Sequence, residues 1–256
     1  MNTKKLIQEK LLYCEYQPLT NLQDATFAFE ALMRSNPRIN PLTIIQDARN
    51  QGILYELDTL CINNAIGEFP TAYLEKYFLF VNIFPSTIIH QDFLKLIQNL
   101  ISRYPHIKKR VVFEINEDKA EESLLNFPIF FERLMYLKSV GIRIAFDDIP
   151  ITRSTFEQME KFVPHFVKLD HTRSKDLANS IEKQQLISLV LDYTDENVEL
   201  VLEGIESEAD LLIAKDLGVP LFQGYYISKP FRLLEETIVH SQPTVIDMDG
   251  PSSLKV

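Results

Sequence analysis

The chain has 256 residues, a formal net charge of −10 and a content of 46% hydrophobic residues. Its length suits one α/β barrel with a large core, and its composition is ordinary for a soluble globular protein. The acidic balance argues against a binder of nucleic-acid polymers, and no stretch reaches the roughly 20 apolar residues of a membrane span. Residues 1–12 are expected to form an amphipathic helix rather than a signal peptide. Cys14 and Cys61 lack CxxC spacing, so a cytoplasmic protein without a membrane segment is predicted.

Along the rest of the chain, short apolar runs alternate with longer segments of helical periodicity. In chain order we expect strand 11–19, strand 26–34, helix 41–51, helix 53–66, strand 77–84, helix 90–104, strand 110–115, helix 120–139, strand 141–148, helix 154–162, strand 165–170, helix 180–192, strand 198–204, helix 206–217 and strand 219–226. This alternation indicates a mostly parallel sheet, and eight strands indicate a closed TIM-like (β/α)8 barrel of the α/β class.

Two segments depart from a regular barrel. Only residues 20–25 separate the first two strands, so these strands are expected to pair as an antiparallel hairpin. No linker interrupts the chain before about residue 235, and residues 1–235 are therefore assigned to one barrel domain. Residues 236–256 contain Pro243, Gly250 and Pro251, and they are expected to form a mobile C-terminal tail.

Polar side chains follow the end of nearly every predicted strand. In chain order they are Glu30 and Arg34, Asn82, Glu114 and Glu117, Asp147 and Asp148, Lys168 and Asp170, Glu203 and Glu206, and Gln223. In a parallel barrel such positions face one rim, where the active sites of this fold lie. So many acidic side chains on one rim are costly unless cations neutralise them. An acidic residue after a strand can instead cap the next helix, and Asp170 and Glu206 are candidates for that role.

The ligand chemistry of this rim favours Mg²⁺ or Mn²⁺, because the strand ends offer oxygen atoms and no His or Cys. Two such ions roughly 3.5–4 Å apart bind phosphate oxygens and activate a water for phosphodiester cleavage. Lys168 beside them would act as a general base or orient the water. Arg34 is either part of a surface ion pair or, as we favour, a contact to a substrate phosphate, because guanidinium matches phosphate geometry.

The ordered motifs of the chain resemble those of the EAL-domain family, which are bacterial phosphodiesterases that linearise cyclic di-GMP to pGpG. The resemblance covers about residues 16–230 and includes the tripeptide Glu30-Ala31-Leu32. The other matching motifs are Tyr16-Gln17-Pro18, Val81-Asn82, Glu114-Ile115-Asn116-Glu117, Asp147-Asp148, Lys168-Leu169-Asp170, Glu203-Gly204-Ile205-Glu206 and Gln223-Gly224-Tyr225. Each motif alone is nonspecific, whereas the ordered set is very specific.

The resemblance implies a barrel with one antiparallel strand, a homodimer, and binding of cyclic di-GMP together with Mg²⁺ or Mn²⁺. It implies catalytic roles for Lys168, Glu30 and Glu203. It further implies metal binding by Glu30, Asn82, Glu114, Asp147, Asp148 and Glu203. Substrate contacts are implied for Gln17, Arg34, Gln223 and Asp170, and support of the site for Glu117 and Glu206.

One departure from the family pattern follows the two aspartates. The family usually carries Phe-Gly-Thr-Gly there, whereas this chain carries Ile149, Pro150, Ile151 and Thr152. Proline fixes φ and lacks an N–H, so it restricts the motion of this loop. That favours an alternative, a catalytically silent receptor for cyclic di-GMP or a protein partner. A barrel enzyme of another kind, which uses one Mg²⁺ for proton abstraction, is a third alternative. Hydrolysis remains the preferred prediction, because no candidate ligand is missing.

Overall fold

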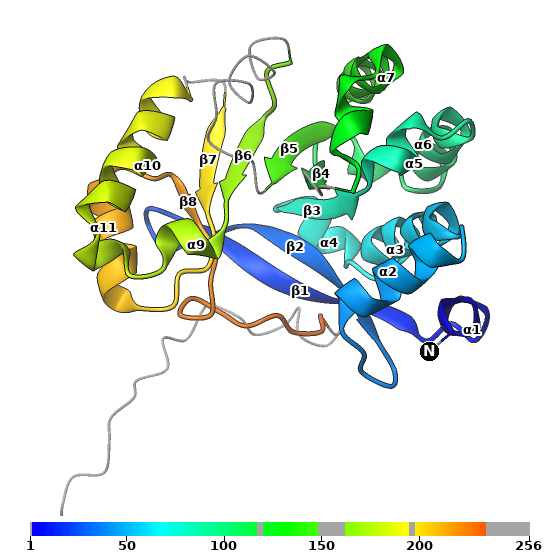
Figure 1. Cartoon of the computed structure of the whole chain (residues 1–256), viewed down its shortest axis with the longest axis horizontal. Helices are drawn as coiled ribbons and strands as arrows, with labels where there is room; N and C mark the ends of the chain where they lie inside the picture. Colours follow the sequence, from blue (N-terminus) through cyan, green and yellow to red (C-terminus); the bar gives the residue numbers. More distant parts are fainter. Residues whose placement is uncertain (1, 117–119, 148–161, 195–197, 234–256) are drawn as a thin grey trace, which may run out of the picture.

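The structure is a computed structural model that describes residues 2–116, 120–147, 162–194 and 198–233. Within these residues, eight strands form a closed barrel in the order β1 to β8 (Figure 1). The strands are β1 Leu12–Asn21, β2 Thr26–Ser35, β3 Phe78–Ile83, β4 Val111–Asn116, β5 Arg143–Asp147, β6 Phe166–Leu169, β7 Glu199–Leu202 and β8 Leu221–Phe222. The predicted TIM-like α/β barrel is therefore confirmed.

β1 is the strand that departs from the parallel arrangement. It pairs antiparallel with β2, so that Gln17 lies opposite Glu30. Its other end closes the barrel by pairing antiparallel with β8 through Thr20 and Asn21. The pairs from β2 to β8 are parallel. The predicted hairpin is thus confirmed, and the start of β1 lies at the same rim as the carboxyl ends of the other strands.

Helices surround the barrel. Those described are α1 Thr3–Gln8, α2 Pro41–Asn50, α3 Leu54–Gly67, α4 Thr71–Leu74, α5 Pro85–Ile89, α6 Phe93–Arg103, α7 Pro128–Ser139, α9 His171–Ser174, α10 Ile181–Tyr193 and α11 Glu208–Asp216, with the 3-10 helices η1 Pro105–Ile107, η2 Glu122–Asn126 and η3 Leu177–Asn179. In Figure 1, α2, α3, α5, α6 and α7 lie along one side of the barrel, and α10 and α11 lie along the opposite side. Buried residues of helices and strands share one large core. In the described part of the chain, no helix has the length and hydropathy needed to cross a bilayer.

Two of the predicted helices differ from those observed, and a proline explains the first difference. The helix expected at residues 120–139 is divided into η2 and α7, because the residue before a proline avoids the α conformation and Pro128 begins α7. The helix expected from residue 90 begins only at Phe93, after the short helix α5 that starts at Pro85. Prolines therefore mark the starts of α5 and α7.

Two further predictions concern the last strand and segments without a described structure. β8 has only two paired residues of the run expected at residues 219–226. The helix expected at residues 154–162, apart from Phe162, lies outside the described residues. The tail expected at residues 236–256 also lies outside them.

One buried apolar residue from every strand fills the centre of the barrel. These residues are Leu19, Ala28, Phe80, Val112, Ala145, Phe166, Val201 and Leu221. The rings of Phe80 and Phe166 meet in this layer, with centroids 5.0 Å apart. Side chains two residues apart on a strand share a face, so the next inward residue of each strand lies nearer the rim. The layer is therefore the floor of whatever site the rim holds.

Loss of one of the two phenylalanine rings in this floor is expected to destabilise the protein strongly. Phe166→Ala should lower the free energy of unfolding by about 3–5 kcal/mol, because a closely packed interior cannot collapse around the cavity. Urea unfolding measures the change. Phe127→Ala is the matched control, since the Phe127 side chain is 46% exposed. An equal loss in both variants would contradict the role assigned to this layer.

Candidate active site

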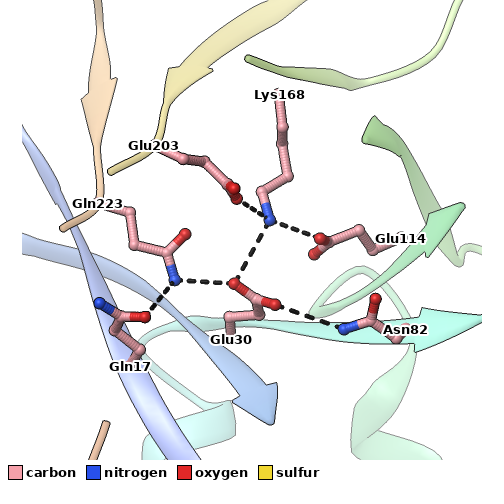
Figure 2. Close-up of polar contacts among 7 residues, drawn as sticks. All are labelled: Gln17, Glu30, Asn82, Glu114, Lys168, Glu203 and Gln223. Carbon is pink, nitrogen blue, oxygen red and sulfur yellow. Dashed lines mark hydrogen bonds and ion pairs between the residues drawn. The ribbon is translucent and has the colours of Figure 1, made fainter. Parts of the chain in front are cut away.

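Polar side chains stand directly above the apolar floor, one from each strand. Each lies two residues from the floor residue of the same strand, toward the rim. They are Gln17, Glu30, Asn82, Glu114, Asp147, Lys168, Glu203 and Gln223. All were candidate site residues from the sequence, and Figure 2 shows seven of them in one connected network. Because side chains alternate between the two faces of a strand, the inward face of each strand carries both its floor residue and its site residue.

The Lys168 ammonium group lies at the centre of this network. Its side chain is 1% exposed, and Nζ lies 2.5 Å from Glu114 Oε1 and 3.4 Å from Glu30 Oε2. Nζ also forms an ion pair with Glu203 Oε1 (Figure 2). Beneath it, the centroid of the Phe80 ring lies 6.0 Å away. A cation this deeply buried is tolerable because carboxylates from three other strands or strand ends surround it.

Glu30 connects the lysine to the amide side chains of the rim. Its Oε2 accepts a hydrogen bond of 2.8 Å from Gln223 Nε2, and its Oε1 accepts one of 3.4 Å from Asn82 Nδ2. Gln223 Nε2 also lies 3.3 Å from Gln17 Oε1, and Gln17 donates from Nε2 to the Ser228 carbonyl oxygen. These contacts hold the Glu30 carboxylate in one orientation.

The carboxylates outnumber the cation, and the pKa values reflect this imbalance. Burial and the charge on Glu30 raise the pKa of Glu114 well above its usual value, against the opposing effect of Lys168. Burial raises the pKa of Glu203 to about 8, although Lys168 again opposes the shift. Burial disfavours the charge on Lys168, but Glu114, Glu203 and Glu30 together hold the pKa of the lysine well above its usual value. Without a bound cation, part of this cluster retains protons at neutral pH.

The cluster fits a divalent cation. Oxygen atoms of Glu30, Glu114 and Glu203 lie within 4.8 Å of one another. Glu114 Oε2 and Gln223 Oε1 are buried and have no hydrogen-bond partner among the described residues. Unpartnered buried oxygens that face several carboxylates are a costly arrangement, which a hard cation with oxygen ligands would relieve. Among the described residues, Glu30, Glu114 and Glu203 are therefore the best placed to hold a divalent cation.

Two glycines allow the strand ends that carry Glu203 and Gln223 to lie close together. Gly224 packs against the next backbone, where an added Cβ would lie only 2.0 Å from the Ile205 carbonyl oxygen. Ile205 N in turn donates to the Gln223 carbonyl oxygen over 3.0 Å. Gly204 has a φ of +67°, and an added Cβ would lie 2.1 Å from His171 Cβ. No side chain fits at either position.

A cavity of about 360 Å³ opens beside the network. Its walls include Gln17, Glu30, Leu32, His171, Glu203, Gly204, Glu206, Gln223, Gly224 and Tyr225. Among the side chains in these walls, those of Leu32, His171 and Tyr225 had no role assigned from the sequence. A sequence signal existed for each, because each lies two or three residues beyond an inward-facing polar residue, where a strand end reaches the rim. Their apolar and aromatic side chains form part of the cavity wall, which the pattern of charged residues at the strand ends does not predict.

Arg34 lies farther out along β2 than Glu30, and on the same face of the strand. Its Nε donates to Glu15 Oε2 over 2.7 Å, and its Nη1 donates to the Met33 carbonyl oxygen over 2.9 Å. Arg38 Nη2 lies 3.0 Å from the same Glu15 oxygen. The ion pair that was weighed for Arg34 is thus present, and the phosphate contact remains a prediction. Glu15 itself was missed, although it alternates with Gln17 on β1.

The other candidate residues have more peripheral or undescribed positions. Asp170 occupies the N-cap position of α9, and its Oδ1 accepts a hydrogen bond of 2.6 Å from Thr172. Glu206 is exposed and lines the cavity. Glu117, Asp148 and the altered loop Ile149–Thr152 lie outside the described residues.

A second buried network fixes the loop that follows β3. Phe84 N donates to Asp58 Oδ2 over 3.0 Å. Glu121 accepts hydrogen bonds from the Ser86 backbone N–H and hydroxyl, and its Oε1 lies 3.1 Å from Arg49 Nη2. Burial raises the pKa of Asp58 to about 7, despite these hydrogen bonds to its carboxyl group. The loop that leaves the site strand β3 is therefore tied to α2, α3 and η2.

Comparisons with known proteins agree with this geometry. A family model described as the EAL domain matches residues 2–230 of the chain. The probable cyclic di-GMP phosphodiesterase PdeN of Escherichia coli K12 is 28% identical over 242 residues, which cover 89% of this chain and 45% of PdeN. The chain spans less than half the length of the first curated relatives that it matches.

Solved structures share the barrel. The EAL enzyme Bd1971, in a form bound to cAMP and cyclic di-GMP, has a TM-score of 0.80 at 22% identity, over 90% of this chain and 64% of that one. BlrP1 of Klebsiella pneumoniae, in a complex with calcium and cyclic di-GMP, has a TM-score of 0.76 at 23% identity, over 86% of this chain and 56% of that one. At these identities the likeness establishes the fold.

The buried carboxyl group of Asp58 is expected to make stability depend on pH. The folded protein holds a proton up to about pH 7, whereas the unfolded chain releases it near the ordinary value of 3.8. The free energy of unfolding should therefore fall as the pH rises from about 4 to about 7. Asp58→Asn keeps an acceptor oxygen and has no carboxyl proton to release. Its free energy of unfolding, relative to that of the wild type, should therefore rise through that window by about 1.4 kcal/mol per unit of pKa difference.

Urea unfolding between pH 4 and pH 8 tests this expectation. Asp192→Asn, a change at an exposed position of α10, is the matched control and should follow the wild type. Parallel pH dependence in the wild type and Asp58→Asn would show that the group titrates normally.

Divalent cations are expected to stabilise the folded protein through the glutamate cluster. Mn²⁺ at about 100 times its dissociation constant should stabilise the protein by about 2.7 kcal/mol, and hence raise Tm. Glu30→Gln removes one of the three clustered carboxylates and should abolish most of this rise. Glu208→Gln, an exposed acid at the start of α11, should retain it. Differential scanning calorimetry measures Tm with and without Mn²⁺, and an equal rise in all three proteins would refute the assignment.

Proposed function

Because the chain belongs to the EAL domain family, we propose that it is a metal-dependent phosphodiesterase that hydrolyses cyclic di-GMP to linear pGpG. We further propose that it acts in the cytoplasm as a homodimer. PdeN is named a probable cyclic di-GMP phosphodiesterase, and Bd1971 and BlrP1 were solved with cyclic di-GMP. These relatives support the choice of substrate.

The observation that carries the proposal is the cluster of Glu30, Glu114 and Glu203 around Lys168. Three carboxylates within 4.8 Å of one another supply the hard oxygen ligands that Mg²⁺ and Mn²⁺ prefer. An anionic diester could not approach such a cluster unless its charge were offset. A site that combines buried acids with a buried lysine suits phosphoryl chemistry better than histidine-based or zinc-based hydrolysis.

The proposed mechanism uses six metal ligands. They are Glu30, Asn82, Glu114, Asp147, Asp148 and Glu203. Two Mg²⁺ or Mn²⁺ ions would supply an activated water and offset the charge of the phosphate oxygens. Asn82 is the most exposed of the described ligands and Glu203 is partly exposed, so substrate would meet the site from their side.

Lys168, Glu30 and Glu203 form the proposed catalytic set. Two roles are proposed for Lys168, that of a general base and that of a group that orients the attacking water. An ammonium group cannot accept a proton, but it can donate a hydrogen bond to the oxygen of the attacking water. Its contacts to Glu30 and Glu203 would hold it at a constant position between these two carboxylates. Lys168 would therefore be held where it can orient the water or, in its neutral form, accept a proton from it.

Substrate contacts are proposed for Gln17, Arg34, Gln223 and Asp170. Gln17 and Gln223 line the cavity directly. Arg34 would have to exchange part of its ion pair with Glu15 for a phosphate oxygen, which is feasible because both are anionic acceptors for a guanidinium group. Glu206 lines the cavity and Glu117 follows β4, and both are proposed to support the site.

A catalytically silent receptor is the second candidate. The observation that favours it is the sequence Ile149, Pro150, Ile151 and Thr152, where the family usually has two glycines. A restricted loop would still permit cyclic di-GMP to bind, but it would limit the movements needed for turnover.

The deciding experiment incubates purified protein with cyclic di-GMP and either Mn²⁺ or Mg²⁺ and separates the products by chromatography. We expect pGpG in the wild type and none after chelation with EDTA. Lys168→Ala should lower kcat by at least about 100-fold, the typical contribution of a group that positions or transfers a proton. Lys215→Ala is the matched control, because Lys215 pairs with Asp24 in the turn between β1 and β2.

Other outcomes separate the alternatives. Saturable cyclic di-GMP binding without product would establish the receptor function. Neither binding nor product would indicate a protein-interaction module. Normal turnover by a correctly folded Lys168→Ala variant would refute the catalytic role of this lysine. Circular dichroism checks the fold of each variant.

A further inference from the structure

A second cavity lies at the open end of the β1–β2 hairpin, apart from the acidic site. It has a volume of about 350 Å³, and its polar lining residues are Lys10, Tyr13, Ser35, Asn36, Arg38 and Arg232. Ser35 is five residues beyond Glu30 on β2, which corresponds to about 16 Å along the strand. The two cavities share no lining residue. This pocket is therefore a separate place of binding, of a size that suits a small ligand.

The pocket concentrates positive charge in a chain whose net charge is −10. Lys10 and Arg232 are exposed and have no acidic partner among the described residues. Arg38 is 69% exposed, and it shares one oxygen of Glu15 with the neighbouring Arg34. One carboxylate thus serves two guanidinium groups. The three cations that line the pocket therefore have only a shared carboxylate as an ion-pair partner among the described residues, and an anionic ligand would offset this local positive charge.

The positions of the cations are held by the fold. Arg232 stacks over the Tyr13 ring, with Cζ 4.5 Å from the ring centroid. Stacking occupies the face of a guanidinium group and leaves the N–H donors at its edge free. The segment before it is fixed, because Phe231 and Tyr16 exchange two backbone hydrogen bonds of 2.7 and 3.0 Å. Arg232 is therefore preorganised as a donor to an oxyanion.

Lys10 and the polar residues complete the pocket from the other side. Lys10 has a φ of +54° at the turn from α1 into β1, and its N–H donates to the Ile7 carbonyl oxygen. Asn36 is anchored by its N–H, which donates to the Leu11 carbonyl oxygen over 2.9 Å. Cationic side chains from three separate segments thus converge on one cavity, and no acidic side chain of the described residues lines it.

We propose that this basic pocket is a second ligand site, which binds a phosphate monoester without a metal ion. A monoester is a dianion at neutral pH and matches the excess charge better than a singly charged diester. Guanidinium and ammonium groups are the usual partners of such an oxyanion. The same chemistry is offered by inorganic phosphate and by the terminal phosphate of a nucleotide.

Isothermal titration calorimetry with the full chain in EDTA tests the proposal. EDTA removes divalent cations, so that the acidic cluster repels phosphate and the result does not depend on the proposed hydrolysis. The probes are inorganic phosphate, GMP and uncharged guanosine. Phosphate and GMP should bind and guanosine should not. Equal affinities for the two anions identify phosphate itself as the ligand, whereas tighter binding of GMP identifies a nucleotide.

Variants assign the binding to this pocket. Lys10→Gln and Arg232→Gln should each weaken GMP binding about tenfold, the loss expected for one charge-assisted hydrogen bond. Arg103→Gln is the matched control, because Arg103 is an exposed arginine that also stacks on a tyrosine ring, that of Tyr104. Absence of saturable binding by both anions, equal binding of guanosine, or unchanged affinity in both pocket variants would each overturn the proposal.

Discussion

The buried ammonium group of Lys168 is the interaction on which the site depends. It lies among carboxylates of Glu30, Glu114 and Glu203, which would repel one another without it. One positive charge compensates only part of their charge, and burial keeps water from screening the rest. Burial, and after it the remaining imbalance of charge, raises the pKa of Glu114 and Glu203. The arrangement is therefore costly to the fold for the same reason that it attracts a divalent cation.

A simple repeat of side chains along the strands places the charged cluster and the apolar core in separate layers of the barrel. Every strand supplies one apolar residue to the floor, and the inward residue two positions nearer the rim is polar. The floor excludes water beneath Lys168 and packs closely around Phe80 and Phe166. The reversed strand β1 takes part as well, because its antiparallel pairing places Gln17 opposite Glu30. Site and core are thus two adjacent layers of one closed sheet.

Charge of opposite sign is arranged along the β1–β2 hairpin. The acidic cluster lies at Glu30, the basic pocket lies beyond Ser35, and the ion pair of Glu15 and Arg34 lies between them. The acidic cluster would repel an anionic ligand unless cations were bound there. The basic pocket would attract the same ligand. The hairpin therefore holds two electrostatic environments on one rigid support, and Arg34 stands where they meet.

The sequence by itself determined the barrel, its antiparallel hairpin, the family and the rim residues. These features are local, because alternation along a strand decides which face each side chain takes, and a closed parallel barrel brings the strand ends to one rim. The tertiary structure alone decided which charges meet: Arg34 pairs with Glu15 across the hairpin, and Arg232 reaches Tyr13 from the other end of the chain. It also decided that the Lys168 side chain lies buried among three glutamates. Such contacts depend on strand register and barrel closure, which no periodicity within a single strand encodes.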